Sequence, residues 1–321
     1  MSKPLRALGA ALSVPVLLLA TACGTGAQPS GDEPGQLTIV TAFYPFQFVS
    51  ERVAGASAEV VSLTTPGADP HDLELSPGQL IDISEADLVV YQSGFQPAVD
   101  EAVAQQGPEH VIDVAQVVRL QPVPEHEHGE EGHEEHEEEA GEEGHDHGDT
   151  DPHAWLDPEN MQMITEAVAT ELAAVSPDDA AAFQTEADEL VADLEQLDSD
   201  FSEGLQTCER REFITSHAAF GYLATRYDLT QIGISGISPD AEPSPARLAE
   251  IHTEAEEHGV TTIFTETLAS PALAEAVAGD LGLRTDVLDP LEGLNGQSRG
   301  SDYIAVQQAN LEALRTAGGC S

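Results

Sequence analysis

The sequence predicts an α/β protein with two parallel-sheet lobes joined by a long backbone helix. Two stretches, residues 37–114 and 212–316, alternate short apolar strand patterns with helical patterns, which is typical of parallel sheets. A long apolar stripe with helical spacing lies between them, and 321 residues suffice for two lobes of roughly 150 residues each. We expect a first lobe at 37–160, linking helices at 161–207 and a second lobe at 208–321.

In the first lobe, strand and helix patterns take turns. Short runs rich in apolar and β-branched side chains predict strands at 37–41, 58–64, 87–91 and 110–114. Helices are expected at 46–54, 76–86 and 97–106. The second of these begins with Ser76 and Pro77, an N-cap followed by proline at the first helical position.

The second lobe repeats the alternation. Strands are expected at 212–215, 229–234, 260–265 and 284–288, and helices at 218–227, 244–258, 271–281 and 301–316. Ser244 and Pro245 give the second of these helices the same N-terminal signal.

Asp157-Pro158 and Ser176-Pro177 each signal the start of a linking helix. The second helix carries one apolar stripe, with intervals of three or four residues: Phe183, Ala187, Leu190, Leu194, Leu197, Phe201 and Leu205. It would run about 30 residues, or roughly 45 Å. We interpret it as a rigid strut between the lobes; a coiled-coil dimer seam is the alternative.

Composition excludes several classes. With 11 Lys and Arg against 59 Asp and Glu, the formal charge is −48. A surface with this much negative charge repels phosphate backbones. We therefore expect no nucleic-acid partner. Apolar residues make up 40 %, enough for a sizeable core, and no apolar run reaches the length of a membrane-spanning helix.

The N-terminal residues have the pattern of an export signal. Lys3 and Arg6 precede an apolar stretch, and small residues lead to Cys23. This resembles a bacterial lipoprotein signal, which implies a signal peptide at 1–22, lipidation of Cys23 and a lipid-anchored tether at 23–36. The protein would then be exported and anchored to the outer face of the cell membrane. An ordinary secretory signal is the alternative.

Two further cysteines, Cys208 and Cys320, are expected to pair. Export implies an oxidising compartment, where a disulfide is favoured over a metal site. Two free thiols are the alternative.

Residues 125–151 form a segment rich in acids and histidines, with 14 Asp and Glu and no Lys or Arg. The segment has no apolar periodicity, so we expect a loop. Its six histidines are His126, His128, His133, His136, His145 and His147. Their irregular spacing predicts a weak, multi-site auxiliary metal-binding loop; a solvated acidic loop is the alternative.

A primary metal site is predicted from residues that follow strands or precede helices. Asp69-Pro70-His71 and Asp151-Pro152-His153 repeat one tripeptide at corresponding places. His217 and Asp289 each follow a predicted strand, at the sheet edge where α/β proteins bind ligands.

Three imidazoles and one carboxylate suit a tetrahedral Zn²⁺ site, with His71, His153, His217 and Asp289 as its ligands. Asp289 is alternatively a turn former. Glu266 is a rival carboxylate, or a hydrogen-bond partner of a ligand.

The sequence resembles the metal-binding solute-binding proteins of zinc and manganese ABC importers, closest to the zinc type. The resemblance spans 37–320 and rests on residues 41–45, 67–74, 151–157, 216–222, 265–266 and 288–291. It implies two α/β lobes, a backbone helix, a metal held between the lobes and a His-rich loop. Manganese members place a glutamate where His217 stands, so the third imidazole argues for zinc.

The resemblance implies an extracytoplasmic protein that binds zinc and delivers it to an ABC permease and its ATPase. We expect a monomer with no enzymatic activity, which meets the membrane only through its lipid anchor. Three alternatives remain: a manganese or iron importer component, a secreted zinc-dependent hydrolase, and an adhesin or sequestering protein. The sequence has no His-Glu-x-x-His motif to support the hydrolase.

Overall fold

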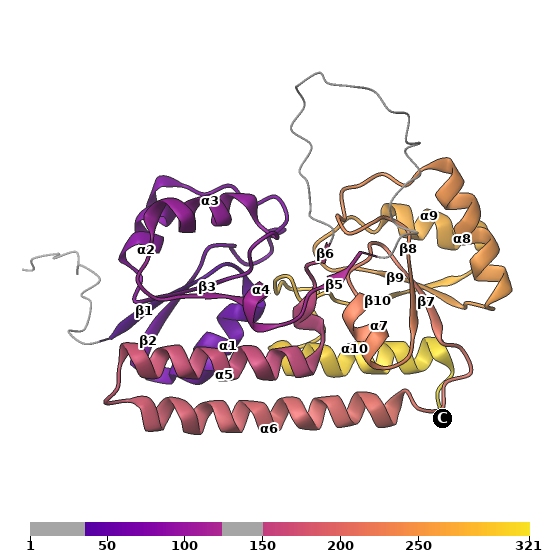
Figure 1. Cartoon of the computed structure of the whole chain (residues 1–321). Coiled ribbons are helices and arrows are strands. Elements are labelled where there is room, and N and C mark those ends of the chain that lie inside the picture. The colour runs from indigo at the N-terminus through magenta and orange to yellow at the C-terminus, as the bar shows by residue number, and fades with distance from the viewer. Residues whose placement is uncertain (1–35, 124–149) are drawn as a thin grey trace, which may run out of the picture. The chain divides into compact units, whose positions relative to one another are not determined.

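The computed structural model describes residues 36–123 and 150–321. The predictions for Cys23, its tether and the six loop histidines lie outside these residues. Two four-stranded sheets, each purely parallel, form the lobes (Figure 1). The α/β alternation of the sequence is thereby confirmed.

The first sheet has the strand order β2-β1-β3-β4. Its strands are β1 (Leu37–Thr41), β2 (Ala58–Ser62), β3 (Leu88–Tyr91) and β4 (Val111–Asp113). Ile39 in β1 lies opposite Val60 on one side and Leu88 on the other. A short antiparallel ribbon follows, made of β5 (Gln121–Pro122) and β6 (Thr150–Asp151).

The second sheet has the order β10-β9-β7-β8, which read from β8 is the same arrangement as the first. Its strands are β7 (Glu212–Thr215), β8 (Thr230–Gly233), β9 (Thr262–Thr265) and β10 (Arg284–Val287). In each sheet the chain runs first to one side and then to the other. Ligand sites form where this direction changes, which here is between β7 and β9.

The helices of the first lobe are α1 (Tyr44–Ala54), η1 (Gly55–Ser57), α2 (Pro77–Glu85), α3 (Pro97–Gln106) and α4 (Val114–Val117). The predicted start of α2 is confirmed. Ser76 accepts a hydrogen bond from the backbone of Gln79, and the Gln79 side chain bonds back to the Ser76 backbone. This capping box satisfies N–H groups that a helix start leaves unpaired.

The helices of the second lobe are α7 (Gly221–Arg226), α8 (Pro245–Glu257), α9 (Ala272–Leu281) and α10 (Tyr303–Gly318). Ser244 caps α8 as predicted, and Asp302 caps α10. A separate apolar cluster supports the second sheet, and it includes Ile214, Ile251 and Ile263, all fully buried.

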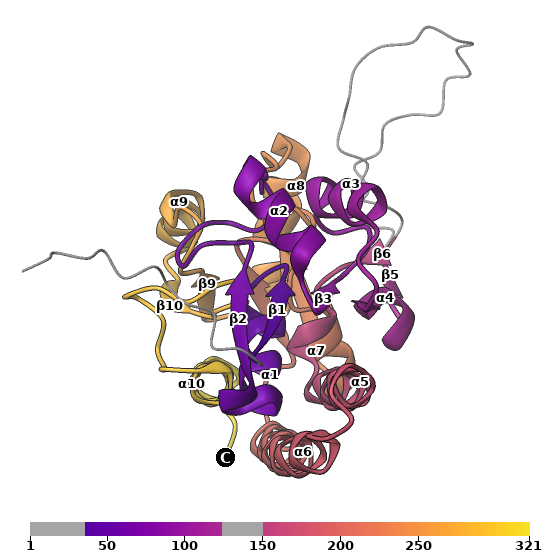
Figure 2. The ribbon, with the colours of Figure 1, turned by 90° about the vertical axis from the view of Figure 1, so that its left-hand side faces the viewer.

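Two linking helices, α5 (Pro158–Val175) and α6 (Ala180–Gly204), run beneath the sheets. The whole predicted stripe of α6 is buried against α5, α1 and α10 (Figures 1 and 2). Since α1 belongs to the first lobe and α10 to the second, α6 is a strut between them. The stripe is covered within one chain, so the dimer-seam alternative is wrong.

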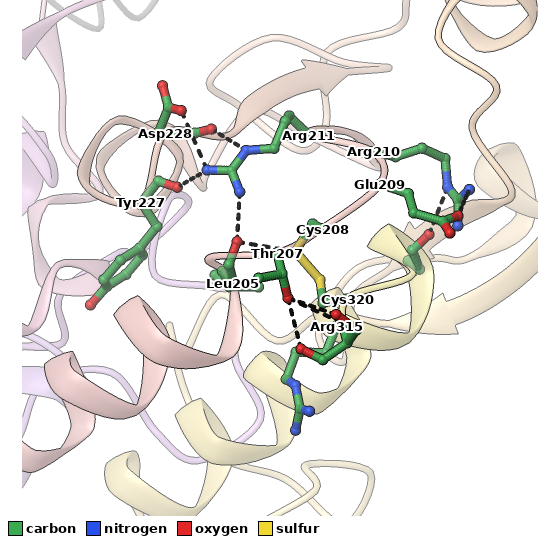
Figure 3. Close-up of a disulfide and its surroundings, with 12 residues drawn as sticks. Leu205, Thr207, Cys208, Glu209, Arg210, Arg211, Tyr227, Asp228, Arg315 and Cys320 are labelled. Atoms are coloured by element: carbon green, nitrogen blue, oxygen red, sulfur yellow. Dashed lines mark hydrogen bonds and ion pairs between the residues drawn. A yellow bond between two sulfur atoms is a disulfide. The ribbon is translucent and has the colours of Figure 1, made fainter.

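A disulfide joins Cys208, just after α6, to Cys320, just after α10, as the sequence predicts (Figure 3). The two cysteines are 112 positions apart in sequence. Nearby, Thr207 donates to the Ser321 carbonyl and Arg210 to that of Ala317. These contacts fasten the end of α10 to the start of the second lobe. Among the described residues, no helix has the length and apolarity needed to cross a bilayer.

Candidate metal centre

Four segments bring polar side chains together where the two lobes meet. His71 lies in the loop after β2, and His153 lies directly before a short helix, η2 (Ala154–Leu156). His217 follows β7 and Glu292 follows β10. These two sit at the carboxyl edge of the second sheet, where parallel α/β sheets bind their ligands.

The two Asp-Pro-His tripeptides form the same local turn. Asp69 Oδ1 accepts a hydrogen bond from the His71 backbone N–H at 2.8 Å, and Asp151 Oδ1 accepts one from the His153 N–H at 2.9 Å. The aspartate side chain thus closes a small turn on its own backbone, while proline fixes the residue between. Each turn therefore fixes the backbone conformation at its histidine.

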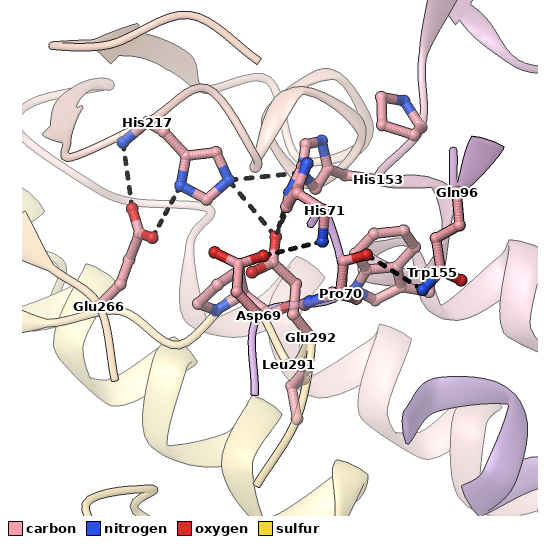
Figure 4. Close-up of polar contacts among 12 residues, drawn as sticks. Asp69, Pro70, His71, Gln96, His153, Trp155, His217, Glu266, Leu291 and Glu292 are labelled. Atoms are coloured by element: carbon pink, nitrogen blue, oxygen red, sulfur yellow. Dashed lines mark hydrogen bonds and ion pairs between the residues drawn. The ribbon is translucent and has the colours of Figure 1, made fainter. Parts of the chain in front are cut away.

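The three histidines and Glu292 converge on one point (Figure 4). Glu292 Oε1 lies 3.1 Å from His71 Nε2 and 3.4 Å from both His153 Nε2 and His217 Nε2. One nitrogen or oxygen from each of the four lies within 4.8 Å of all the others. All four residues are buried, so the arrangement is shielded from water.

Carboxylates outside this group orient two of the rings. His153 Nδ1 donates to Asp151 Oδ1 at 2.8 Å, and His217 Nδ1 donates to Glu266 Oε2 at 2.7 Å. A carboxylate accepts only, so each Nδ1 carries a proton, and each Nε2 is the atom left to bind an ion once it has lost any proton that it shares with Glu292. Metal-binding histidines are commonly oriented in this way. Glu266 is therefore placed as a partner of His217 and not as a member of the group.

The structure does not bring Asp289 into the group. Asp289 Oδ1 accepts from the Leu291 N–H at 2.9 Å, and Oδ2 accepts from the Thr267 hydroxyl at 3.1 Å. It is a turn former, the alternative stated for it above, and its turn is the one seen at Asp69 and Asp151. The carboxylate that joins the histidines comes from Glu292, three positions later.

Glu292 was missed by the sequence reasoning, although a signal for it exists. In both Asp-Pro-His turns the aspartate bonds the backbone and a later side chain points to the centre. The same logic applied to Asp289-Pro290 directs attention to the residues that follow, of which Glu292 is the first that is able to bind a metal.

The electrostatics of the group follow from its composition. Burial by itself raises the pKa of Glu292, but the three imidazoles around it, His71 foremost, hold the pKa well below its usual range. Burial lowers the pKa of His217, and the carboxylates of Glu266 and Glu292 outweigh this and raise it well above its ordinary value. The pKa of His153 is also raised, because hydrogen bonds to Asp151 and Glu292 more than offset the lowering that burial causes. The metal-free site thus keeps the Glu292 carboxylate ionised beside His153 and His217, which hold their protons to higher pH, and a bound cation would take the place of those protons.

Buried hydrogen bonds tie the segment of His153 to the second lobe. Trp155 Nε1 donates to the Pro290 carbonyl at 2.8 Å, and the Tyr303 hydroxyl donates to the Trp155 carbonyl at 2.6 Å. Trp155 and Tyr303 are fully buried. The segments that carry His153 and Glu292 are therefore held at a fixed position relative to each other.

Several known proteins are similar to this chain in sequence and in fold. The family described as zinc-uptake complex component A, periplasmic (ZnuA) matches residues 39–317. The chain is 37 % identical over 306 residues to the high-affinity zinc uptake system protein ZnuA of Bacillus subtilis, covering 93 % of each chain. It is also 37 % identical over 312 residues to the zinc-binding lipoprotein AdcA of Streptococcus pneumoniae, covering 93 % of this chain.

Among solved structures, Zn(II)-bound AdcA from Streptococcus pneumoniae superposes with a TM-score of 0.72 at 34 % identity. The match covers 88 % of this chain and 58 % of that one. The present chain spans about 60 % of the length of AdcA. The ZnuA match covers most of the chain and includes every residue of the buried group. The chain therefore belongs to the ZnuA family of zinc-uptake components.

Proposed function

We propose that this protein binds one zinc ion with His71, His153, His217 and Glu292, and delivers it to an ABC permease driven by its ATPase. One observation carries the proposal: the four metal-binding groups come from both lobes, are buried, and lie within 4.8 Å of one another. Family membership and the zinc-binding names of the relatives support the same cargo.

The donor set favours zinc over manganese. Imidazole nitrogen suits borderline ions such as Zn²⁺, whereas Mn²⁺ prefers carboxylate, carbonyl and water oxygens. Three of the four donors are imidazoles, and four is the coordination number of closed zinc sites.

Transport fits the geometry better than hydrolysis. A hydrolytic zinc keeps one coordination position open for water, and three protein ligands hold the metal. Here four buried protein groups are available to one ion, and if all four bind it in the four-coordinate arrangement usual for zinc, no position is left for water. The group therefore binds its ion as cargo.

In this proposal, Cys23 carries the lipid anchor that holds the protein at the outer face of the membrane. The name of the relative AdcA, a zinc-binding lipoprotein, supports it. The six histidines of residues 125–151 collect zinc near the membrane and feed the buried site. The proposal takes the protein as a monomer, and the burial of the α6 stripe by its own chain removes the one dimer seam considered above.

The binding half of the proposal is tested by metal analysis. A variant that lacks residues 125–149 should retain one tightly bound zinc after dialysis against a weak chelator. His217→Ala in that background should lose it, because the substitution removes one of four ligands. His252→Ala on α8 is the matched control and should retain it. Full retention of zinc by His217→Ala would refute the site.

Growth under zinc limitation tests the delivery half. A strain without the protein should grow poorly when zinc is scarce, and the wild-type chain should restore growth whereas His217→Ala should not. Equal restoration by the two chains would refute delivery from this site. Hydrolysis that tracks bound zinc would favour the hydrolase instead.

A further inference from the structure

The buried group has no evident route for its ion. Of its members, His71 is 8 % exposed, Glu292 is 2 %, and His153 and His217 are fully buried. A protein that delivers zinc has to release it as well as hold it. The following inference rests on the proposed function and asks where the ion passes.

A cavity of about 140 Å³ reaches the group at Glu292. Its walls come from both lobes: Tyr44, Thr64 and Thr65 lie on one side, and Glu292 and Leu294 on the other. A cavity of roughly 10–15 Å³ on this measure is enough for one water molecule, so the cavity holds several. A partly hydrated divalent cation therefore fits in it.

Glu292 forms the boundary between the cavity and the histidines. Its Oε1 lies 3.1 to 3.4 Å from the three Nε2 atoms, and the same residue lines the cavity. No histidine of the group lines this cavity, so an ion that enters by it reaches Glu292 first.

The other groups that line the cavity bind cations weakly. Tyr44 stays a neutral phenol because burial raises its pKa. The Thr64 hydroxyl is engaged with the Ala42 carbonyl, to which it donates at 2.9 Å. Neutral oxygens solvate a divalent ion without holding it as a full set of imidazoles does. The cavity therefore suits passage.

The backbone next to Glu292 is strained. Leu291 has a φ of 59°, a left-handed conformation that costs a side chain of this kind of order 1–3 kcal/mol. The residue after Glu292 is Gly293, where an added Cβ would meet only ordinary van der Waals contacts. Because Trp155 bonds the Pro290 carbonyl and Asp289 bonds the Leu291 N–H, this backbone is held in place, so a motion that admits the ion is confined to the Glu292 side chain.

A second, larger cavity of about 330 Å³ does not reach the group. It is lined by Asp151 and Gln231, which hold His153 and His217 from outside. Arg247 and Glu254, which form an ion pair at 3.8 Å, also line it. No member of the metal-binding group lines this cavity.

We propose that zinc enters and leaves the site through the cavity between Thr65 and Leu294, with the Glu292 carboxylate as the first ligand it meets and the last it leaves. Thr65 is exposed, lines the cavity and is not a member of the metal-binding group. A larger side chain at this position narrows the route and leaves the donor set intact.

The test measures the rates of zinc binding and release in Thr65→Phe. Trp155 is the only tryptophan of the chain, and its ring centroid lies 5.1 Å from that of His153, so its fluorescence reports binding. Stopped-flow mixing with zinc gives the association rate, and mixing with excess chelator gives the dissociation rate. Both should fall about tenfold, a barrier increase of about 1.4 kcal/mol, while Kd stays within about threefold.

Three companion variants keep the result decisive. Thr65→Ser should match wild type, and Thr65→Leu gives a second obstruction if the phenylalanine disturbs folding. Thr225→Phe obstructs the second cavity and should leave both rates unchanged. Unchanged rates in both obstructed Thr65 variants, or a slowing confined to Thr225→Phe, would overturn the route. Absence of zinc binding by wild type would instead refute the proposed function.

Discussion

Replacing Glu292 with glutamine removes one negative charge from the middle of three imidazoles and keeps the size of the side chain. Glu292 Oε1 lies 3.1 to 3.4 Å from the three Nε2 atoms, so a central ion is in direct contact with it. Two unit charges 4 Å apart interact by about 4 kcal/mol at an effective dielectric of 20, and zinc carries two. The amide oxygen can still coordinate and recovers part of this. We expect a net loss of about 3 kcal/mol, or about a hundredfold in Kd.

Asp289→Asn is the matched control, because it makes the same chemical change at the neighbouring carboxylate. Asparagine Oδ1 can still accept from the Leu291 N–H, so the turn survives. Burial raises the pKa of Asp289, so a neutral side chain is well tolerated there. We expect less than about a threefold change in Kd, since the altered charge is not at the ion.

The assay is a competition titration of each variant against a chelator of known zinc affinity, with circular dichroism to confirm folding. A larger loss in Asp289→Asn than in Glu292→Gln would refute the assignment of the fourth ligand. It would also restore Asp289 to the place that the sequence predicts for it.

Three further outcomes follow from the structure. The raised pKa of His217 means that the metal-free site keeps its proton to higher pH, so zinc affinity should rise as pH passes upward through and beyond about 6.5; a flat profile in chelator competition would contradict this. Replacing both Cys208 and Cys320 with serine should lower the melting temperature and leave zinc affinity unchanged. The loop-entropy estimate limits the loss in the free energy of unfolding to about 4–5 kcal/mol. Deleting residues 125–149 should remove weak zinc equivalents in calorimetry and preserve the tight one; loss of the tight equivalent would place ligands in the deleted segment.

Strand and helix positions were largely predictable, because local patterns specify them. The start of α6 was not. Ser176-Pro177 has the pattern of a helix start, yet the Ser176 N–H bonds back to Leu172 at the end of α5, and α6 begins at Ala180. The residues between form the tight connection of two antiparallel helices. A capping pattern predicts that a helix begins nearby, and the packing of α5 against α6 determines the residue at which α6 begins.

The site was predictable to the extent that each ligand has a local signature. His71 and His153 follow the same Asp-Pro pair, and His217 follows a strand that the sequence shows clearly. The fourth position depends on Leu291, whose positive φ decides which later side chain turns toward the centre. A positive φ is unusual for leucine, so the local sequence does not predict this conformation. The Asp289-Pro290 pair points to the residues that follow it but does not specify which of them faces the centre. Tertiary packing of the fully buried Leu291 imposes the positive φ.

The contacts between the lobes explain why ion exchange is a local event. Separating the lobes would break the buried bonds from Trp155 to Pro290 and from Tyr303 to Trp155, and would disturb the ion pair of Arg226 on α7 with Asp198 on α6. Each buried group left unsatisfied costs about 1–3 kcal/mol, so wide opening costs several kcal/mol before any apolar surface is exposed. Moving the Glu292 side chain breaks the contacts of one buried group and adds a rotamer cost of order 0.5–1.5 kcal/mol, whereas separating the lobes leaves several buried groups unsatisfied. The cheaper motion lies at the cavity, so the strut and the interlobe bonds keep the three histidines in place while the carboxylate admits or releases the ion.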